Sequence, residues 1–597
     1  MAATLPARLR RWAHTTPEVL ALRHKDLGLW REYTWAEYDE LAARAGLGLL
    51  ALGVQAGDRV AVIGDNRPEW LFADLGAQGI GAVVVGVYAT SPSDEVHYLL
   101  EHSGSAVAVV EDEEQLDKIL AVRDRLPALR AIVLMEPRGA THHLAAGAAI
   151  TFDALLERGR TRERAEYDTR VDALDPEALA VLVYTSGTTG PPKGAMLTHA
   201  NLRAAADVLP TVMEARAGDD LLSYLPLCHI AERLFTVVNP LASGYRVSFG
   251  GGADALLADL REVQPTLFFG VPRVWEKMLA GIEIRMADAS WFKRKNFALW
   301  MAVGRRLGRK RLDRRPLTVI DRALEALGWV LLYRPLRERL GLARVRFAGC
   351  GAAPIAPQVI EAFWALGVRI REVYGQTEGT ALATYTPEHD VRPGAVGIAY
   401  PNVELRLSDD GEILVRGPGI FAGYYRNEEA TRDTVDPAGW LHSGDVGTLD
   451  ADGFLRITDR KKGIIITAGG KNISPSWIEN KLKVSPYLRE AIVIGDRRKY
   501  CVALIGIELD TVSDWATRRR ISYTTYKDLG ERPEVIALVS ELVDQVNEDL
   551  APVERIKRFA MIPKELDHEE GELTATQKVK RRAIAAQFSE LIEGLYQ

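Results

Sequence analysis

The chain has 597 residues, of which 47% are hydrophobic and 26% charged, and its formal net charge is −6. This length predicts several subdomains, and the charge gives no indication of a nucleic-acid partner. The 3 cysteines form no CxxC pair, which excludes a disulfide framework and fits a reducing compartment. Residues 1–25 contain no signal-like apolar core. We therefore expect a cytoplasmic protein, with peripheral contact to the inner face of the membrane left open.

The first part of the chain alternates short β-branched runs with amphipathic stretches. The runs that predict strands are 59–64, 82–88, 106–112 and 131–135, and those that predict helices are 35–52 and 94–101. This alternation is typical of α/β layers with largely parallel sheets. The apolar run from Leu75 is too short and glycine-rich to span a membrane, and it indicates a buried helix end followed by a buried strand. The polar segment Leu155–Asp175 is expected to be a surface loop.

From about Val403 the pattern changes to short strands separated by Asp-Gly turns, which indicate antiparallel hairpins. These hairpins predict a small β-barrel-like part. The charged segment Asp459–Gly463 has no apolar anchor and is followed by a compact α/β pattern. We therefore predict a large N-terminal domain over residues 1–458 and a small C-terminal α/β domain over residues 459–597.

The stretch "YTSGTTGPPKG", Tyr184–Gly194, concentrates glycine, hydroxyl groups and one lysine. A buried strand is predicted before it, at 178–184, and a helix after it, from Asn201. The stretch does not have the P-loop spacing, but backbone N–H groups, hydroxyls and a cation in one concavity suit phosphate oxygens. A polar surface linker is the alternative, although the buried strand ahead of the loop argues against it. The candidate phosphate-binding residues are Ser186, Gly187, Thr188, Thr189, Gly190 and Lys193.

Five motifs occur in order along the chain: "YTSGTTGPPKGAMLTH", "YGQTEG", "SGD", "DRKKGIIITAGGKNISPSWIE" and "GELTATQKVKR". Together they resemble the motifs of the adenylate-forming enzymes, which include acyl-CoA synthetases, peptide-synthetase adenylation domains and luciferases. The last motif lacks the Ser-Gly often found before its lysine, as is common in long-chain members. The resemblance implies the two-domain α/β fold of that family.

The resemblance also implies a reaction with ATP, Mg²⁺ and coenzyme A. A carboxylate would attack the α-phosphate of ATP, and the acyl group would then move from AMP to a thiol. Glu378 and Thr185 would hold Mg²⁺, because phosphoryl chemistry depends mostly on positioning and on neutralising the charge of the phosphates. Taken singly, such residues are often ordinary surface or core residues; the ordered motifs favour function. The implied nucleotide-binding residues are Gly351, Ala352, Ala353, Tyr374, Gly375, Gln376, Thr377, Asp445 and Arg460.

A lysine of the last motif is implied as a catalytic residue. Lys578 would bridge the carboxylate and the α-phosphate in the transition state. Lys580 is the competing candidate, but the family register fits Lys578. Basic runs near a C-terminus are usually solvated. The resemblance further implies that the small domain rotates between the two reaction steps about Lys462, which would bring Gly469 and Gly470 to the path of the thiol.

"LPLCHIAER", "FFGVPRVWEK" and "NRPEW" resemble the long-chain acyl-CoA synthetase branch in particular. His229 would lie near the carboxylate; a core histidine is the alternative. We expect a long-chain fatty acid–CoA ligase, an acid–thiol ligase. Three alternatives stay open: an enzyme that loads an acyl carrier protein, a CoA ligase for another bulky acid, and a non-catalytic nucleotide- or lipid-binding protein. A homodimer is also left open.

Residues 285–346 are rich in Arg and Lys, with Trp291, Trp300 and Trp329 among them. Basic residues beside aromatic ones on a helix suit a membrane surface. The alternative is a solvated helical insert that packs on the large domain, and ion pairs between these arginines and neighbouring acids would favour it.

Overall fold

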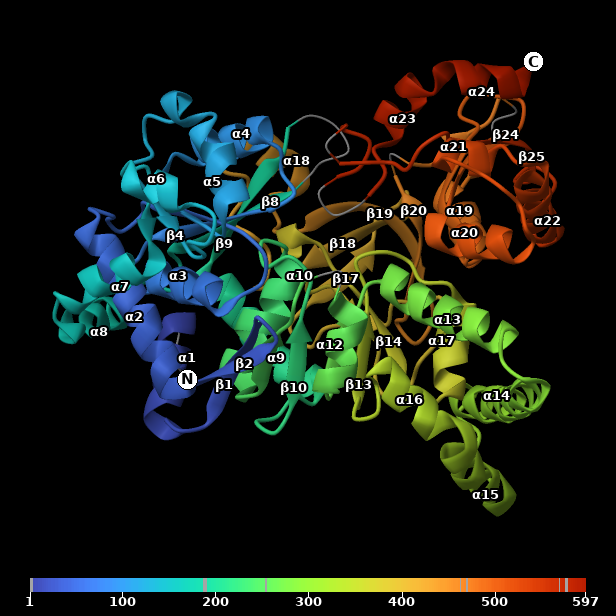
Figure 1. The fold of residues 1–597 in the computed structure, drawn as a ribbon, viewed down its shortest axis with the longest axis horizontal. Coiled ribbons are helices and arrows are strands. Elements are labelled where there is room, and N and C mark those ends of the chain that lie inside the picture. The colour runs from blue at the N-terminus through green and yellow to red at the C-terminus, as the bar shows by residue number, and fades with distance from the viewer. Residues whose placement is uncertain are drawn as a thin grey trace.

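The computed structural model describes residues 4–185, 191–252, 255–461, 463–468, 471–568, 570–574 and 578–597. These residues form two large β-sheets covered by helices, together with three smaller sheets. Figure 1 shows the elements of the last part of the chain, in orange and red, at the upper right, above the green helices of the middle of the chain. This arrangement is the α/β fold class that the sequence predicted.

One large sheet has the strand order β7-β6-β5-β3-β4-β8-β9, and all neighbouring pairs are parallel except β8 and β9. Its strands are β3 (Arg59–Ile63), β4 (Val83–Val87), β5 (Ser105–Val110), β6 (Ala131–Leu134), β7 (Ile150–Thr151), β8 (Leu179–Thr185) and β9 (Lys193–Thr198). The four strands predicted in the first part of the chain are therefore confirmed. Because side chains alternate along a strand, Val60 and Val62 pack in one core while Ala61 and Ile63 pack in another.

Helices cover both faces of this sheet. The helices α2 (Trp35–Ala51) and α3 (Pro68–Gly79) share the core of Val60 and Val62, and α4 (Ser93–Ser103) and α5 (Glu113–Leu120) share the opposite core. Helix α3 ends at Gly79 just before β4, as the apolar run predicted. Burial on both faces explains why these strands are continuously apolar.

The other large sheet has the order β16-β15-β14-β13-β12-β10-β11-β1-β2. Its strands are β1 (Leu20–Asp26), β2 (Leu29–Thr34), β10 (Asp220–Ser223), β11 (Arg246–Phe249), β12 (Leu267–Gly270), β13 (Phe347–Cys350), β14 (Ile370–Tyr374), β15 (Thr384–Tyr385) and β16 (Ile398–Ala399). The central strands are parallel and the outer pairs antiparallel. The carboxyl ends of β13 and β14 therefore meet at one edge, where ligands bind in sheets of this kind.

The segment 155–175 is helical, so its prediction as a surface loop is wrong. It forms most of α7 (Phe152–Arg160) and all of α8 (Arg164–Asp172). Leu155, Tyr167 and Val171 are buried against α2 and α3. The segment was predicted as a loop because its many charged residues outnumber the few apolar residues that anchor it. Ion pairs at i, i+4 spacing, such as Arg164–Asp168, stabilise the side of the helix that faces solvent.

An antiparallel sheet follows, with the order β17-β18-β19-β20, and it lies at the predicted β-barrel-like part. Its strands are β17 (Glu404–Leu407), β18 (Glu412–Arg416), β19 (Leu441–Leu449) and β20 (Leu455–Arg460). Gly411 and Gly453 have φ of 81° and 82° in the turns, a conformation that favours glycine. The Asp-Gly turns therefore mark hairpins, as predicted.

The last part of the chain has its own sheet, with the order β23-β24-β25, and a short pair β21-β22. Its elements are β21 (Ile465–Ile466), β22 (Asn472–Ile473), α19 (Pro475–Lys483), β23 (Leu488–Ile494), β24 (Cys501–Ile507), α20 (Leu509–Arg518), α21 (Tyr526–Gly530), α22 (Pro533–Glu548), β25 (Ile556–Met561), α23 (Arg581–Gln587) and α24 (Ser589–Tyr596). Buried residues of β23, β24 and α22 form a separate core.

The remaining helices lie around the nine-stranded sheet. They include α1 (Leu5–Thr15), α9 (His199–Met213), α12 (Leu256–Val263), α13 (Pro272–Ala287), α14 (Trp291–Leu312), α15 (Val319–Gly328), α16 (Arg334–Leu340) and α17 (Pro357–Ala365). Helix α18 (Glu428–Thr434) instead lies beside β19 of the antiparallel sheet. Of the helices that the structure describes, none combines the length and the apolar composition that crossing a bilayer requires.

Candidate active site

The loop rich in glycine and hydroxyls connects β8 to β9. Residues 186–190 lie outside the described residues, so the roles predicted for Ser186, Gly187, Thr188, Thr189 and Gly190 stay predictions. Thr185 ends β8 and Lys193 begins β9 as its cross-strand partner. The predicted phosphate loop therefore connects the two strands of a hairpin.

The predicted strand–loop–helix order is wrong because β9 lies between the loop and helix α9. Thr198 caps α9: its side chain accepts from the N–H of Asn201, and the Asn201 side chain accepts from the N–H of Thr198. The helix terminus is thus saturated by its own capping box at the far end of β9. In this part of the chain, we therefore expect phosphate contacts from the loop and from Lys193 rather than from the start of α9.

Tyr424, which the sequence analysis missed, joins this hairpin to Glu378. Its hydroxyl donates to Glu378 Oε1 over 2.6 Å, and its backbone forms a β-bridge with Ala195 of β9. The Nζ of Lys193 lies 5.0 Å from the centre of its ring. The tyrosine is 8% exposed. The motif "GYY" around it was the available sequence signal, but its contact with Glu378 depends on tertiary structure.

Glu378 and Thr185 have the oxygen atoms that Mg²⁺ prefers. Tyr424 occupies Oε1 of Glu378, and among the described residues no donor contacts its Oε2. The Thr185 hydroxyl donates to the carbonyl of Lys193 over 3.4 Å, which leaves its oxygen free to accept or coordinate. Lys193 and Tyr424 connect these two positions. The donor set therefore fits a hard divalent cation.

Asp445 lies at the centre of a second group of predicted residues. Its Oδ2 accepts from the Tyr374 hydroxyl over 2.7 Å, and its Oδ1 accepts from Arg460 Nε over 3.1 Å. Asp445 and Arg460 are cross-strand partners on β19 and β20. Burial, followed by the charge of Asp445, raises the pKa of Tyr374 well above its usual range. The structure thus brings together three residues from three different motifs.

Two predicted nucleotide-binding segments follow the neighbouring parallel strands β13 and β14 at their carboxyl ends. Gly351, Ala352 and Ala353 follow β13, and Ala352 has a φ of 69°. A Cβ atom at Gly375 would lie 2.3 Å from the backbone of Ala381, so only glycine fits the turn after β14. Gln376 and Thr377 continue this turn, and the short helix η5 (Thr377–Gly379) carries Glu378.

Lys578 faces the same site from the last part of the chain. Lys578 is exposed to solvent on one side, while protein atoms of the site lie around its ammonium group. Their desolvation, followed by the charge of Arg460, lowers the pKa of Lys578, while the charges of Asp445 and Glu378 oppose this change. The charge of Lys580 instead influences the pKa values of Glu95 and His568. The structure therefore directs Lys578 rather than Lys580 to the acidic residues.

His229 begins the short helix α10 (Ile230–Arg233), and its Nδ1 accepts from the N–H of Ala231 over 3.2 Å. Burial, followed by the charge of Lys578, lowers the pKa of His229 to about 4. The imidazole is therefore neutral at physiological pH. Because Lys578 is close enough to act on it, His229 belongs to the same site.

A buried network that the sequence analysis did not identify holds the segment before His229. Oε1 of Glu232 accepts from Ser223 Oγ and Thr236 Oγ1, each over 2.6 Å. The amide of Asn66 donates to the carbonyl of Leu225 over 2.6 Å. Burial raises the pKa of Glu232 to about 7. The π-helix η2 (Leu234–Val238) follows directly; such helices often occur at functional sites.

Ion pairs fasten the last part of the chain across this site. His568 Nε2 lies 3.5 Å from Glu95 Oε2 on α4, and Arg518 Nη1 lies 2.9 Å from Asp288 Oδ1. Arg273 of α13 also pairs with Glu508. Figure 1 shows the red segment near α23 reaching towards α4. These contacts keep Lys578 at the site in the observed arrangement.

Three further predicted positions, Lys462, Gly469 and Gly470, lie outside the described residues, and their roles stay predictions. The neighbouring Lys461 pairs with Asp410 over 2.6 Å and with Glu412 over 3.1 Å. The link between the two parts of the chain is therefore tied to the β17–β18 hairpin in this arrangement.

Residues 9–425 match the AMP-binding enzyme family, and residues 462–597 match the AMP-binding enzyme C-terminal domain. The chain therefore belongs to the AMP-binding enzyme family. It is 36% identical over 581 residues to long-chain-fatty-acid–CoA ligase FadD15 of Mycobacterium tuberculosis, covering 95% of this chain and 93% of that protein. It is 32% identical over 617 residues to long-chain-fatty-acid–CoA ligase ACSBG1 of Mus musculus, covering 97% and 83%.

Solved structures share the fold. The anthranilate CoA ligase AuaEII, crystallised with anthranoyl-AMP, has a TM-score of 0.72 and 22% identity, covering 99% of this chain and 98% of its own. ATP-bound MatB from Rhodopseudomonas palustris has a TM-score of 0.71 and 22% identity, covering 99% and 100%. These similarities confirm the predicted adenylate-forming fold.

Proposed function

We propose that the protein is an ATP-dependent long-chain fatty acid–CoA ligase. The carboxylate of the acid attacks the α-phosphorus of ATP and pyrophosphate leaves; the thiol of coenzyme A then attacks the acyl carbon and AMP leaves. The observation that supports this proposal is that the charge of Lys578 acts on His229, while the charges of Asp445 and Glu378 act on Lys578. Membership of the family and the relatives named above support the reaction and its long-chain substrate.

The chemistry of each side chain in the site suggests its role in the reaction. Lys578 neutralises the charge that builds up between carboxylate and α-phosphate. Tyr374 and Gly351–Ala353 bind the adenine, and Asp445 with Arg460 binds the ribose. The β8–β9 loop and Lys193 hold the phosphates. Glu378 and Thr185 hold Mg²⁺, which supplies positive charge to the phosphate oxygens.

Two arrangements of the chain serve the two steps. The observed arrangement, with Lys578 at the site, suits adenylation. We propose that the segment from residue 459 onwards is a separate domain that rotates about Lys462, which withdraws Lys578 and brings Gly469 and Gly470 to the thiol path. The neutral imidazole of His229 adds no positive charge beside the acyl carboxylate and is free to move between steps.

Pyrophosphate release with a panel of carboxylic acids tests this function. We expect turnover with palmitate or oleate, with coenzyme A required for thioester formation. Aromatic and sterol acids test the alternative of another bulky substrate, and an acyl carrier protein in place of coenzyme A tests the carrier-loading alternative. No pyrophosphate release with any acid would contradict an adenylating enzyme, since the first step needs no thiol.

We also propose a peripheral membrane contact, at the inner face of the cytoplasmic membrane, through α15 and the π-helix η4 (Trp329–Tyr333) rather than through the basic triplet of α14. Residues 285–346 contain 17 Arg and Lys against 5 Asp and Glu. Arg309, Lys310 and Arg311 nevertheless pair with Glu361, Asp321 and Glu325. These pairs favour the packed insert over free basic residues.

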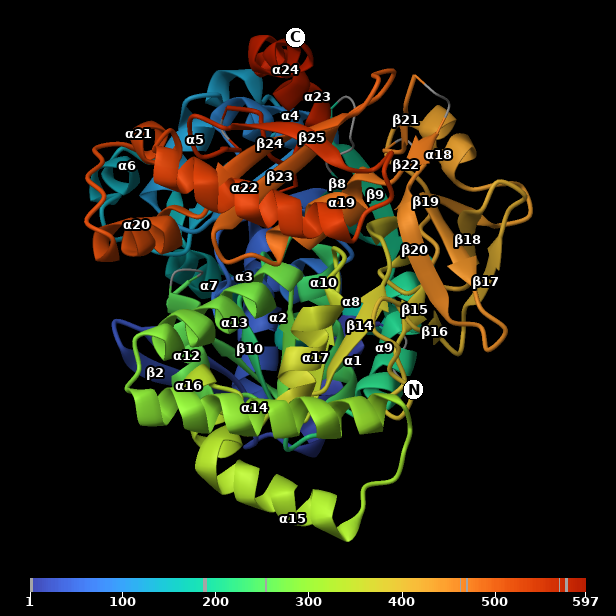
Figure 2. The same cartoon turned by 90° about the vertical axis from the view of Figure 1, so that its right-hand side faces the viewer.

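The polar side of α15 faces α14, and its apolar side faces solvent. Val319 and Ile320 of α15 are 84% and 71% exposed, and Val330 of the adjoining η4 is 67% exposed. Figure 2 shows α15 outside α14 at the edge of the molecule. An apolar helix face on a segment with surplus positive charge suits an anionic bilayer, in which long-chain acids also dissolve.

Sedimentation with vesicles tests this contact. We expect binding to anionic vesicles and its loss in Val319→Ser/Ile320→Ser/Val330→Ser, which leaves the α14–α15 ion pairs intact. Charge reversal of exposed Lys293 and Lys295 should reduce binding at low salt only. Equal sedimentation of the wild type and the serine variant would refute the contact.

A further inference from the structure

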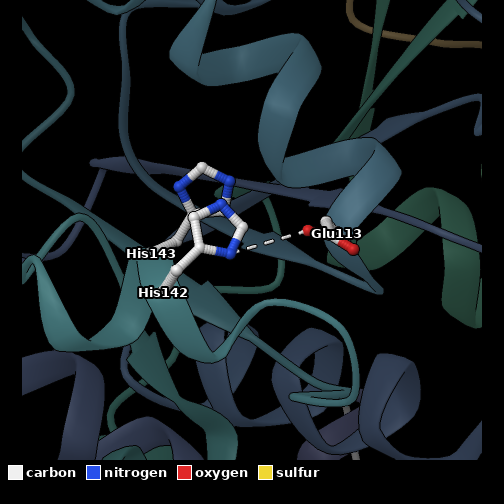
Figure 3. Close-up of side chains that lie close together, drawn as sticks. All are labelled: Glu113, His142 and His143. Carbon is white, nitrogen blue, oxygen red and sulfur yellow. Dashed lines mark ion pairs between the residues drawn. The ribbon is translucent and has the colours of Figure 1, made fainter.

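Two adjacent histidines meet a carboxylate on the outer side of the seven-stranded sheet, away from the site described above. Glu113 begins α5, and His142 and His143 lie on the short helix α6 (Thr141–Ala145). One ligand atom of each residue can be chosen so that all three atoms lie within 4.8 Å of one another. Figure 3 shows both imidazole rings on the same side as the Glu113 carboxylate.

The contacts within this group orient its nitrogen atoms. His142 Nδ1 lies 3.8 Å from Glu113 Oε1, and the centres of the two imidazole rings are 3.8 Å apart. His143 Nε2 lies 2.8 Å from Oδ1 of Asp117, one turn further along α5. A carboxylate that holds one nitrogen of an imidazole is the usual support for a histidine whose other nitrogen binds a metal.

The charge of the group also favours a cation. Of the arginines and lysines that the structure describes, none forms an ion pair with Glu113 or Asp117. Lys118, the nearest basic residue in sequence, pairs with Glu114 over 2.7 Å and donates to the carbonyl of Ala89 over 2.6 Å. The two carboxylates of the group are thus left to their histidine partners.

We propose that Glu113, His142 and His143 bind Zn²⁺, with Asp117 orienting His143. Imidazole nitrogen with carboxylate oxygen is a zinc donor set, whereas Mg²⁺ and Ca²⁺ prefer oxygen alone. Zinc bonds of about 2.0–2.2 Å in a tetrahedron require ligand atoms about 3.4 Å apart. Side-chain rotation would have to close the present spacing to this value, and water would complete the coordination of this partly exposed site.

Bound zinc would link the start of α5 to the segment between β6 and β7, which carries α6. Gly139 comes just before α6, with a φ of 88°, and a Cβ atom there would lie 2.5 Å from Glu113 Oε2. The glycine therefore leaves the room that the Glu113 carboxylate occupies beside the histidines. Because neither helix contributes to the nucleotide site, zinc binding is measurable apart from catalysis.

Isothermal titration of tag-free, chelator-treated protein with ZnSO4, without nucleotide or Mg²⁺, tests the proposal. We expect one equivalent of zinc to bind with a Kd below about 10 μM and to raise the melting temperature. His142→Ala/His143→Ala should weaken binding at least about 100-fold and Asp117→Asn about 10-fold. Co²⁺ in place of zinc should give the visible absorption of a four- or five-coordinate nitrogen–oxygen site.

The matched control is His389→Ala, which removes an exposed histidine beside Glu388, an acidic neighbour on another part of the surface. It should bind zinc as the wild type does. Unchanged pyrophosphate release by the double variant will show that it is folded. The proposal is overturned if wild type binds no zinc at 100 μM, or if wild type and the double variant bind it with equal affinity and stoichiometry.

Discussion

Tyr424 acts at the scale of a single residue by holding one oxygen of Glu378. A hydrogen bond to a charged group contributes about 1.5–3 kcal/mol, and here it also fixes which carboxylate oxygen is free. The same side chain lies beside Lys193 and bridges to β9. A change at Tyr424 therefore acts on cation and phosphate binding together.

Tyr424→Phe should lower kcat/KM for adenylation by about 10- to 100-fold, mainly by raising the Mg²⁺ concentration needed for half-maximal rate. Tyr425→Phe is the matched control, since the neighbouring tyrosine lies beside His102 rather than Glu378. Titration of MgCl2 at fixed ATP, read by pyrophosphate release, measures the effect. A fall in kcat with unchanged Mg²⁺ dependence would assign Tyr424 another role.

Lys578→Ala should abolish acyl-AMP formation and largely spare thioester formation from supplied acyl-AMP, because the lysine is at the site for the first step only. Lys580→Ala, with its side chain near Glu95 and His568, should keep most of the adenylation rate. Each half-reaction is followed separately with purified acyl-AMP. Equal loss of both half-reactions in Lys578→Ala, with a normal circular dichroism spectrum, would contradict the proposal that each step uses a different arrangement of the chain.

At the scale of elements, the sequence predicted the parts whose signal is local. The strands of the seven-stranded sheet and the hairpins after Val403 follow from apolar runs and Asp-Gly turns. The sequence-based predictions for two parts of the chain were wrong. Three buried side chains, Leu155, Tyr167 and Val171, make helices of a segment that reads as polar, and strand β9 separates the phosphate loop from α9.

The motifs predicted many residues of the candidate site, but they did not predict the contacts between those residues. Tyr374 and Asp445 come from different motifs, and their 2.7 Å contact exists only because β14 and β19 meet in space. The network of Glu232 likewise joins α10 to β10 and Asn66. No periodicity or spacing carries such contacts between distant segments.

The buried Glu232 should make stability fall as pH rises. Its pKa is about 7 in the fold, above the usual carboxyl value, so the folded state holds a proton that the unfolded state releases at lower pH. Stability is then lost between about pH 4.5 and 7, by about 3 kcal/mol. Glu232→Gln should flatten this slope of melting temperature against pH. An equal slope in wild type and variant would show that Glu232 does not titrate there.

At the scale of the whole molecule, the population of the observed arrangement depends on a few contacts across the site. His568 and Glu95 come from the two sides of that contact. The Glu95 carboxylate raises the pKa of His568, and His568 in turn lowers the pKa of Glu95. Lys580 opposes the charge on His568. The pair is therefore complete while His568 is protonated and is lost as pH rises through its raised pKa.

Glu95→Gln should slow adenylation about threefold, the shift expected of a pair worth about 0.7 kcal/mol, and should leave thioester formation from supplied acyl-AMP unchanged or faster. In the wild type, the ratio of the two half-reaction rates should move against adenylation as pH rises above the raised pKa of His568; the variant should lack this part of the change. Asp94→Asn is the control, because Asp94 pairs with Arg125 on the same side of the contact. If Asp94→Asn and Glu95→Gln have the same effect, general acidity of α4 is responsible and the His568 pair does not select the arrangement.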